Sequence, residues 1–162
     1  WLESEVKYNI FMIDIEDFKK SIGKKSRLLG IDPGKSRVGL AICDENKLVS
    51  TPFKTIVKKN NSSFVSEIKE IIAENNIKGI IVGNPINMDG SKGSSAQSAN
   101  DFAKYLSNNV SIPIAMWDER LSSEGAFNLS SNLDVNTSKK VEKLDQNAAS
   151  FILQGAIDYI RR

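Results

Sequence analysis

Short apolar runs alternate with amphipathic stretches along the chain, a pattern typical of α/β proteins. The apolar run Arg27–Asp32 stops at a Pro-Gly pair, which predicts a buried strand followed by a sharp turn. The β pattern resumes at Arg37–Cys43, and Leu48–Val57 predicts a third strand that Pro52 interrupts. These segments predict a three-stranded meander.

Apolar residues at helical spacing predict helices that alternate with further strands in the rest of the chain. In order, the predicted elements are a helix from a cap at Ser62 or Ser63 to about Asn75 or Asn76, a strand at Ile77–Val82, a helix with Ala99, Phe102, Ala103 and Leu106 on its apolar face, a strand at Val110–Trp117, a short helix after Leu121, and a last helix at Leu144–Ile160.

This order predicts an α/β fold in which a mixed five-stranded sheet is flanked by helices. An RNase H-like arrangement fits it, and so does a flavodoxin-like one, because periodicity alone does not choose between folds with the same count of elements. The choice therefore depends on the motifs.

Residues 1–26 are interpreted as an N-terminal extension, and residues 27–162 as one compact domain. A short amphipathic helix is expected within Ile13–Ile22 and is expected to dock on the main domain. The chain starts at Trp1, and Met12 is a more natural start, so the residues before Met12 are interpreted either as an extension or as non-native residues and are given no function.

The composition limits the kinds of catalytic site and metal site that the chain can form. The 162 residues include no histidine, which excludes Ser–His and Cys–His nucleophilic pairs and histidine-ligated zinc, so any metal must be held mainly by oxygen. Cys43 is the only cysteine, so a reducing compartment, the cytoplasm, is expected. No apolar run is long enough to cross a membrane, so no membrane partner is expected. The net charge of +2 says little about partners.

Three acids stand at the ends of different predicted elements. Asp32 ends the first strand, Glu119 follows the fifth strand beside Asp118, and Asp145 lies in the first turn of the last helix. Mg²⁺ and Mn²⁺ prefer oxygen ligands, and metal-assisted cleavage of a phosphodiester needs several carboxylates at one place. The candidate catalytic and metal-binding residues are therefore Asp32, the pair Asp118 and Glu119, and Asp145.

Each acid also has a purely structural interpretation, which the sequence alone leaves open. Asp32 could be a turn residue before the Pro-Gly pair. The acid pair before Arg120 could form a surface ion pair with it, and Asp145 could cap the last helix. Trp117 could stack on a base, although a tryptophan in an apolar strand is more often part of the core.

A polar loop and a group of lysines are candidate contacts to nucleic acid. The loop Gly83–Gly93 offers backbone amides, amide side chains and a lysine just before a predicted helix, which suits a phosphate backbone. The lysines near Asp145 could meet a polyanion, although Glu142 interrupts them and a solvated charge run is the alternative. The lysine of the loop is Lys92, and the lysines near Asp145 are Lys139, Lys140 and Lys143.

Four motifs together resemble one known family. They are Leu29–Gly34 with Arg37–Ala41, Gly83–Gly90, Asp118–Ser123, and Leu144–Ala149 with Ile152–Gln154. In this order they resemble the YqgF, or RuvX, proteins, which are described as Holliday-junction resolvases and as pre-16S ribosomal RNA nucleases. The resemblance runs from about residue 27 to the C-terminus.

The resemblance implies an RNase H-like fold and hydrolysis of a phosphodiester by water, assisted by Mg²⁺ or Mn²⁺. It implies that the family's metal-binding acids are Asp32, Glu119 and Asp145. Asp118 is then a supporting residue, and Arg120 is expected to contact phosphate or to brace the acids.

The resemblance also implies a nucleic-acid substrate, with Asn87 and Asp89 shaping the substrate side of the pocket. Processing of the 5′ end of pre-16S ribosomal RNA is favoured, and resolution of branched DNA is the alternative. A non-catalytic nucleic-acid-binding module is a rival that the three acids argue against. A phosphotransferase of the actin and hexokinase kind shares the Asp-Pro-Gly turn, but the chain is too short for its second domain.

A monomer is favoured over a dimer, because the sequence shows no long apolar heptad or exposed apolar strand that would indicate a dimer interface.

Overall fold

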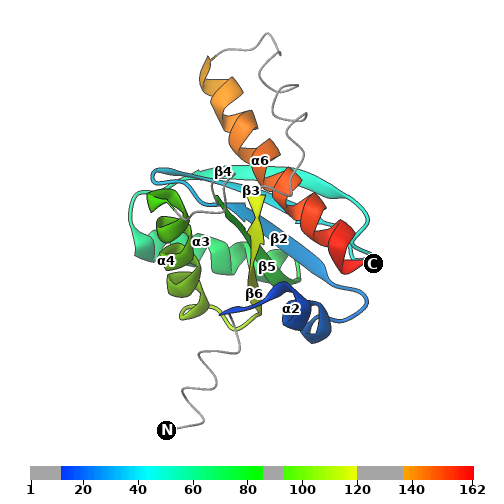
Figure 1. Cartoon of the computed structure of the whole chain (residues 1–162). Coiled ribbons are helices and arrows are strands. Elements are labelled where there is room, and N and C mark those ends of the chain that lie inside the picture. Colours follow the sequence, from blue (N-terminus) through cyan, green and yellow to red (C-terminus); the bar gives the residue numbers. More distant parts are fainter. Residues whose placement is uncertain (1–11, 86–92, 120–136) are drawn as a thin grey trace, which may run out of the picture.

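The computed structural model describes residues 12–85, 93–119 and 137–162, which build a sheet with helices on both faces (Figure 1). The sheet has the strand order β1-β6-β5-β2-β3-β4. Its strands are β1 (Met12–Ile13), β2 (Arg27–Asp32), β3 (Arg37–Cys43), β4 (Ser50–Val57), β5 (Ile77–Asn84) and β6 (Ile114–Asp118).

The sheet joins an antiparallel half to a parallel half. Strand β3 pairs antiparallel with both β2 and β4, whereas β2, β5, β6 and β1 run parallel to one another. An antiparallel meander continued by parallel strands is the RNase H-like order, so the predicted fold and its mixed five-stranded sheet are confirmed for β2 to β6. The pattern did not predict β1, because a strand of two residues shows no periodicity.

The parallel strands β2, β5 and β6 bring polar residues to one edge of the sheet. Ile31 of β2 pairs with Val82 of β5, so Asp32 lies one residue further along, level with the end of β5. Asn84, the last residue of β5, pairs with Asp118, the last residue of β6. Chain segments that are far apart in sequence therefore end side by side.

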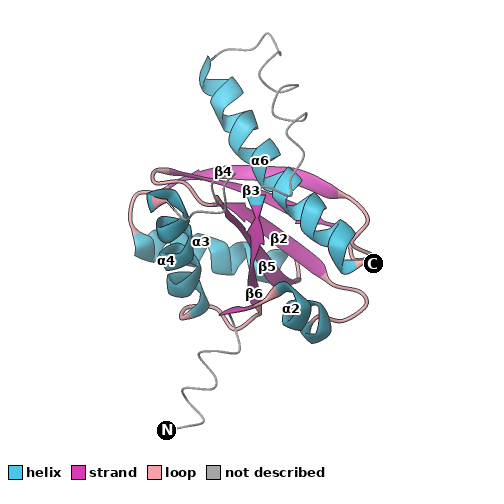
Figure 2. Cartoon of the chain, in the orientation of Figure 1, coloured by secondary structure: helices cyan, strands magenta, loops and turns pink. Residues whose placement is uncertain are grey.

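Helices cover the two faces of the sheet separately (Figure 2). Helices α3 (Asn61–Glu74) and α4 (Ser94–Ser107) pack on one face, and α2 (Ile15–Ser21) and α6 (Thr137–Ile160) pack on the other. Alternate residues of β2 point to opposite faces, Leu28 to the core under α6 and Leu29 to the core under α3. Each face therefore has its own apolar layer.

Helix α2 confirms the short docked helix that the pattern predicted. Asp14 caps it by accepting a hydrogen bond from the Asp17 N–H at 2.8 Å. Phe18 is fully buried and lies against Gly79 of β5, where a Cβ would come within 2.6 Å of the ring. The helix thus contributes an aromatic side chain to the core.

Two predicted boundaries were wrong for local reasons. Helix α3 is capped by Asn60, whose side chain accepts a hydrogen bond from the Ser63 N–H at 2.8 Å, and not by Ser62 or Ser63. Strand β6 does not begin at Val110, because the N–H of that residue donates to the Leu106 carbonyl at 3.1 Å and so closes the end of α4. In both places a hydrogen bond at the end of a helix, and not the pattern of apolar residues, sets the boundary of the element.

Helix α6 begins at Thr137 instead of Leu144, which corrects the predicted place of Asp145. Asp145 lies more than two turns inside the helix, so it does not cap it. The polar residues before it contain neither proline nor glycine, and this allows the helix to extend through a stretch that looked like a loop. The short helix predicted after Leu121 falls outside the described residues.

In the described part of the chain, no helix combines the length and the apolar character that crossing a membrane requires.

Candidate functional site

Asp32 and Glu119 meet at the edge where the parallel strands end. Asp32 ends β2 and Glu119 directly follows β6, with β5 between these two strands. Their carboxyl groups share a hydrogen bond. A Cβ placed on Gly83 of β5 would lie 2.5 Å from Cδ1 of Ile152 and 2.8 Å from Oε1 of Glu119, so both side chains pack over a position that has no side chain. The glycine therefore leaves room for the Glu119 carboxyl.

Asp145 approaches the same place from helix α6. A Cβ placed on Gly39 would lie 2.0 Å from the carbonyl oxygen of Asp145, so the helix backbone rests directly on β3 at this glycine. Gly39 is the residue that pairs with Asp32 across the β2–β3 ladder. Asp145 is therefore placed close enough for its charge to raise the pKa of Asp32.

The surroundings of Asp32 and Glu119 favour their protonated forms. Burial, followed by the charge of Asp145, raises the pKa of Asp32 to about 6. Burial, followed by the charge of Asp32, raises the pKa of Glu119 to about 7, and Asp118 adds to this effect. The carboxyl groups of Asp32 and Glu119 share a hydrogen bond, and burial favours a state in which the pair holds one proton between them.

We expect the free energy of unfolding, measured in a chelating buffer, to fall as the pH rises from about 4 to about 7. Both carboxyl groups have a higher pKa when folded than the usual 3.8 and 4.5, so the folded chain binds more protons across this window. The stabilising contribution of the two carboxyl groups is complete below about pH 4 and is lost as the pH rises to about 7. Urea unfolding at several pH values measures the slope, and Glu119→Gln should flatten it. An equally steep loss in that variant would show that other groups titrate.

The structure brings these acids together without forming a closed metal site. Within residues 12–85, 93–119 and 137–162, no group of three or more Asp, Glu, Cys or His side chains is arranged to hold a metal ion. Asp32 and Glu119 share a hydrogen bond, and the charge of Asp145 raises the pKa of Asp32. The oxygen atoms of these acids are ligands of the kind that Mg²⁺ and Mn²⁺ prefer.

The other predicted site residues are only partly described. Asp118 ends β6, directly before Glu119, and its supporting role stays a prediction. The backbone of Lys139, Lys140 and Lys143 lies in α6, on the N-terminal side of Asp145, and their side chains are outside the described part of the structure. Four further candidates lie wholly outside the described residues, namely Asn87, Asp89, Lys92 and Arg120.

Sequence reasoning missed the roles of Gly39 and Gly83, which give Asp145 and Glu119 their places. The available signal was a glycine inside an otherwise apolar strand, because such a glycine often marks a close approach by another group. Asn84 was also missed as a site residue. Its Oδ1 is buried at the same edge and accepts no hydrogen bond from another described residue.

Trp117 does not serve as a base-stacking surface. Only 6% of its surface is exposed, and its ring packs against Tyr159 with the centroids 5.7 Å apart. It belongs to the core beneath α6, which is the structural interpretation that its apolar strand favoured.

Known proteins match this chain over nearly its whole length. The RuvX family, described as "Holliday junction resolvase", matches residues 26–159. A protein of Pelagibacter ubique named "Putative pre-16S rRNA nuclease" is 59% identical over 149 residues, which are 92% of this chain and 99% of the relative. A protein of the same name from Ruegeria sp. is 40% identical over 146 residues, 90% of this chain and 93% of the relative.

Among solved structures, the yeast mitochondrial Holliday junction resolvase Ydc2 is 12% identical and has a TM-score of 0.49, covering 91% of this chain and 84% of its own. So distant a likeness says nothing about activity. The family match and the close relatives are of another order, and they confirm what the four motifs predicted: this chain belongs to the RuvX family.

Proposed function

We propose that this chain is a metal-dependent nuclease that hydrolyses phosphodiester bonds, with Asp32, Glu119 and Asp145 as its catalytic and metal-binding residues. The observation that carries the proposal is the convergence of these acids, from β2, from the end of β6 and from α6, on one edge of the sheet. Buried carboxyl groups that raise one another's pKa are typical of functional sites. Residues 27–162 form the nuclease domain in this proposal.

The acids fit Mg²⁺ or Mn²⁺ by the chemistry of their oxygen atoms, with no histidine or thiolate among them. Asp32 and Glu119, which now share a proton, would hold the ion together with Asp145, and Asp118 would support them. A bound ion supplies charge neutralisation at the phosphate and lowers the pKa of a water molecule. The Asp145 backbone rests on β3 at Gly39, and the Glu119 carboxyl packs over Gly83.

The proposed substrate is single-stranded RNA. The proposed reaction is processing of the 5′ end of pre-16S ribosomal RNA, during ribosome biogenesis in the cytoplasm. The names of the curated relatives support this choice. A monomer with one site suffices for such a reaction, whereas a resolvase needs a two-fold dimer with two sites. Contacts to the RNA are proposed for Asn87, Asp89, Lys92, Arg120, Lys139, Lys140 and Lys143.

The alternative, a Holliday-junction resolvase acting on branched DNA, is favoured by the description of the family itself. The two functions differ in substrate and in oligomeric state, because paired cuts in a junction require two sites at a fixed spacing.

The test incubates the pure protein with labelled precursor RNA and with four-way junction DNA, with and without Mg²⁺ or Mn²⁺. We expect metal-dependent cleavage of the RNA, strong inhibition by salt, and weak or no paired nicks in the junction. Asp32→Asn is the inactive control, and sedimentation at micromolar concentration measures the oligomeric state. A tight dimer that nicks the junction in pairs and leaves the RNA intact would establish the resolvase, and binding without any cleavage would establish a non-catalytic module.

A further inference from the structure

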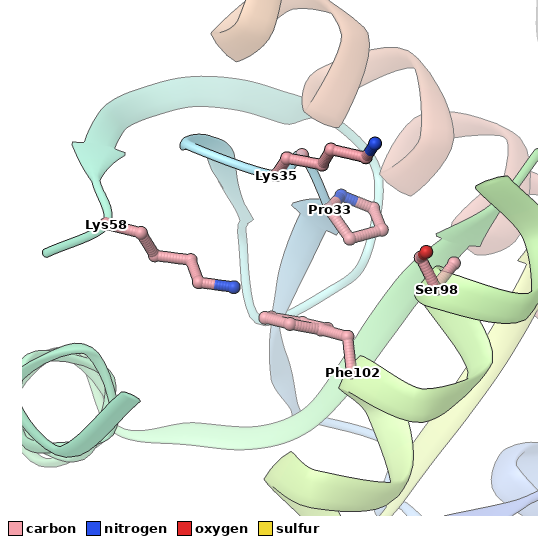
Figure 3. A pocket seen from close by; sticks show the side chains of 7 residues that line it. Pro33, Lys35, Lys58, Ser98 and Phe102 are labelled. Atoms are coloured by element: carbon pink, nitrogen blue, oxygen red, sulfur yellow. The ribbon is translucent and has the colours of Figure 1, made fainter. Parts of the chain in front are cut away.

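A cavity of about 560 Å³ opens at the turn that follows Asp32 (Figure 3). Its walls are the turn that follows Asp32, the residue after β4 and one side of α4, and the residues that matter here are Pro33, Lys35, Lys58, Ser98 and Phe102. The volume lies within the range of small-ligand pockets. Because Pro33 is the next residue after Asp32, the cavity begins where the candidate active site ends.

Lys58 brings a positive charge to this cavity. Its backbone N–H donates to the carbonyl of Ser36 at 2.8 Å, which fixes it beside the turn after β2. Its Nζ atom lies 5.5 Å from the ring centroid of Phe102 and 5.8 Å from that of Phe64. No carboxylate of the described residues lies within ion-pair distance of it. Aromatic faces attract an ammonium group without neutralising it, so the charge is available to an anion.

Lys35 and Phe102 complete the chemistry of the cavity. Figure 3 shows the Lys58 side chain extending toward the ring of Phe102, with Lys35 reaching out from the turn after β2. Lys35 is exposed, and Phe102 is half-buried, with its ring packed at a centroid distance of 5.4 Å from Phe64. Two ammonium groups beside an aromatic ring are the elements that single-stranded nucleic acid requires, since the charges meet phosphate and the ring meets a base.

We propose that this cavity binds one unpaired nucleotide of the substrate strand, next to the phosphate that is cleaved. Its phosphate lies between Lys35 and Lys58, and its base lies against Phe102. The nucleotide is unpaired because the faces of a base inside a duplex are covered by its neighbours. This inference rests on the proposed nuclease function and adds the place where one nucleotide of the strand binds.

The test measures binding of a labelled single-stranded RNA in a chelating buffer, where cleavage does not interfere. Phe102→Leu should weaken binding about tenfold, because one stacking contact is lost, and should leave the salt dependence unchanged. Lys58→Gln should lower the slope of log affinity against log salt by about 0.7, because one phosphate contact is lost. A duplex of the same sequence should bind both variants as it binds the wild type.

Matched controls lie on the same helix. Tyr105, 39% exposed and one turn beyond Phe102, does not line the cavity, so Tyr105→Leu should bind as the wild type does. Lys104→Gln removes the same charge as Lys58→Gln from an exposed position outside the cavity. Because Phe102 packs against the core, Ser98→Glu is a second cavity variant. Ser98 is exposed, so the change removes no core packing, and it places a negative charge in the wall of the cavity that repels the phosphate of the strand, so it should also weaken binding.

The outcomes separate this inference from the nuclease function. If Phe102→Leu, folded by circular dichroism, and Ser98→Glu both bind RNA like the wild type, the cavity proposal is wrong, even where the wild type cleaves RNA. If the wild type binds single strands but cleaves neither RNA nor DNA, and these variants bind single strands more weakly, the nuclease function is wrong and the cavity proposal holds. Failure of the wild type to bind any single strand overturns the cavity proposal.

Discussion

Asp32→Asn is expected to lower the rate of RNA cleavage about a thousandfold or more while the fold stays intact. The change removes a negative oxygen ligand and almost no volume, and a metal ion in such a site contributes several kcal/mol to catalysis. Glu119→Gln and Asp145→Asn should have effects of the same order. Initial rates measure the loss, and circular dichroism checks the fold.

Asp101→Asn is the matched control, because Asp101 accepts a hydrogen bond from Gln97 at 3.0 Å on the exposed side of α4. It should cleave at the wild-type rate. Thermal melting provides a second control. Mn²⁺ should raise the Tm of the wild type, because clustered carboxylates repel one another until a cation binds. It should not raise the Tm of a variant that carries Asp32→Asn, Glu119→Gln and Asp145→Asn together. A wild-type rate in any one of the three variants would remove that residue from the site.

Gly39→Ala should have the largest effect on stability, lowering the free energy of unfolding by about 3 kcal/mol and the Tm by about 10 °C. The added Cβ would lie 2.0 Å from the carbonyl oxygen of Asp145 and 2.4 Å from its carbonyl carbon. These are backbone atoms of a helix and cannot rotate away, so α6 must move off β3. Urea unfolding measures the loss.

Gly23→Ala is the comparison variant, because the nearest atom to its Cβ would be Oγ of Ser26 at 3.6 Å, an ordinary contact. It should unfold like the wild type. Gly39→Ala should also reduce cleavage per folded molecule, since the displaced helix carries Asp145. Near-normal stability of Gly39→Ala would mean that α6 does not rest on β3 at this point.

The sequence predicted the sheet because each long buried strand is a continuous apolar run, and it predicted where Asp32 and Glu119 stand because both follow such runs. It could not predict close approaches between elements. The contact of Asp145 with Gly39 joins positions more than 100 residues apart, and nothing local to either one reveals it. The start of α6 was missed because its first turns are polar, and polar residues at helical spacing look like a loop.

The cavity illustrates the same limit. Phe102 was predicted as part of the apolar face of a helix, and this is half correct, since its ring packs against Phe64. That it also lines a cavity with Lys58 depends on how α4 and the end of β4 lie across the sheet edge. Pattern analysis assigns a residue to one face of its own element, and a pocket is formed by several elements.

The position of β5 between β6 and β2 means that the main chain sets the spacing at which the acid pair is attached to the sheet. One strand separates β2 from β6, so the two acids are attached to the sheet about 10 Å apart, two interstrand spacings, whatever the core residues are. Backbone hydrogen bonds fix this interval, and repacking of the core does not change it. Core substitutions should therefore shorten the lifetime of the folded state and leave this backbone interval unaltered, so sequences can drift apart while the attachment points of the two acids stay at a constant spacing.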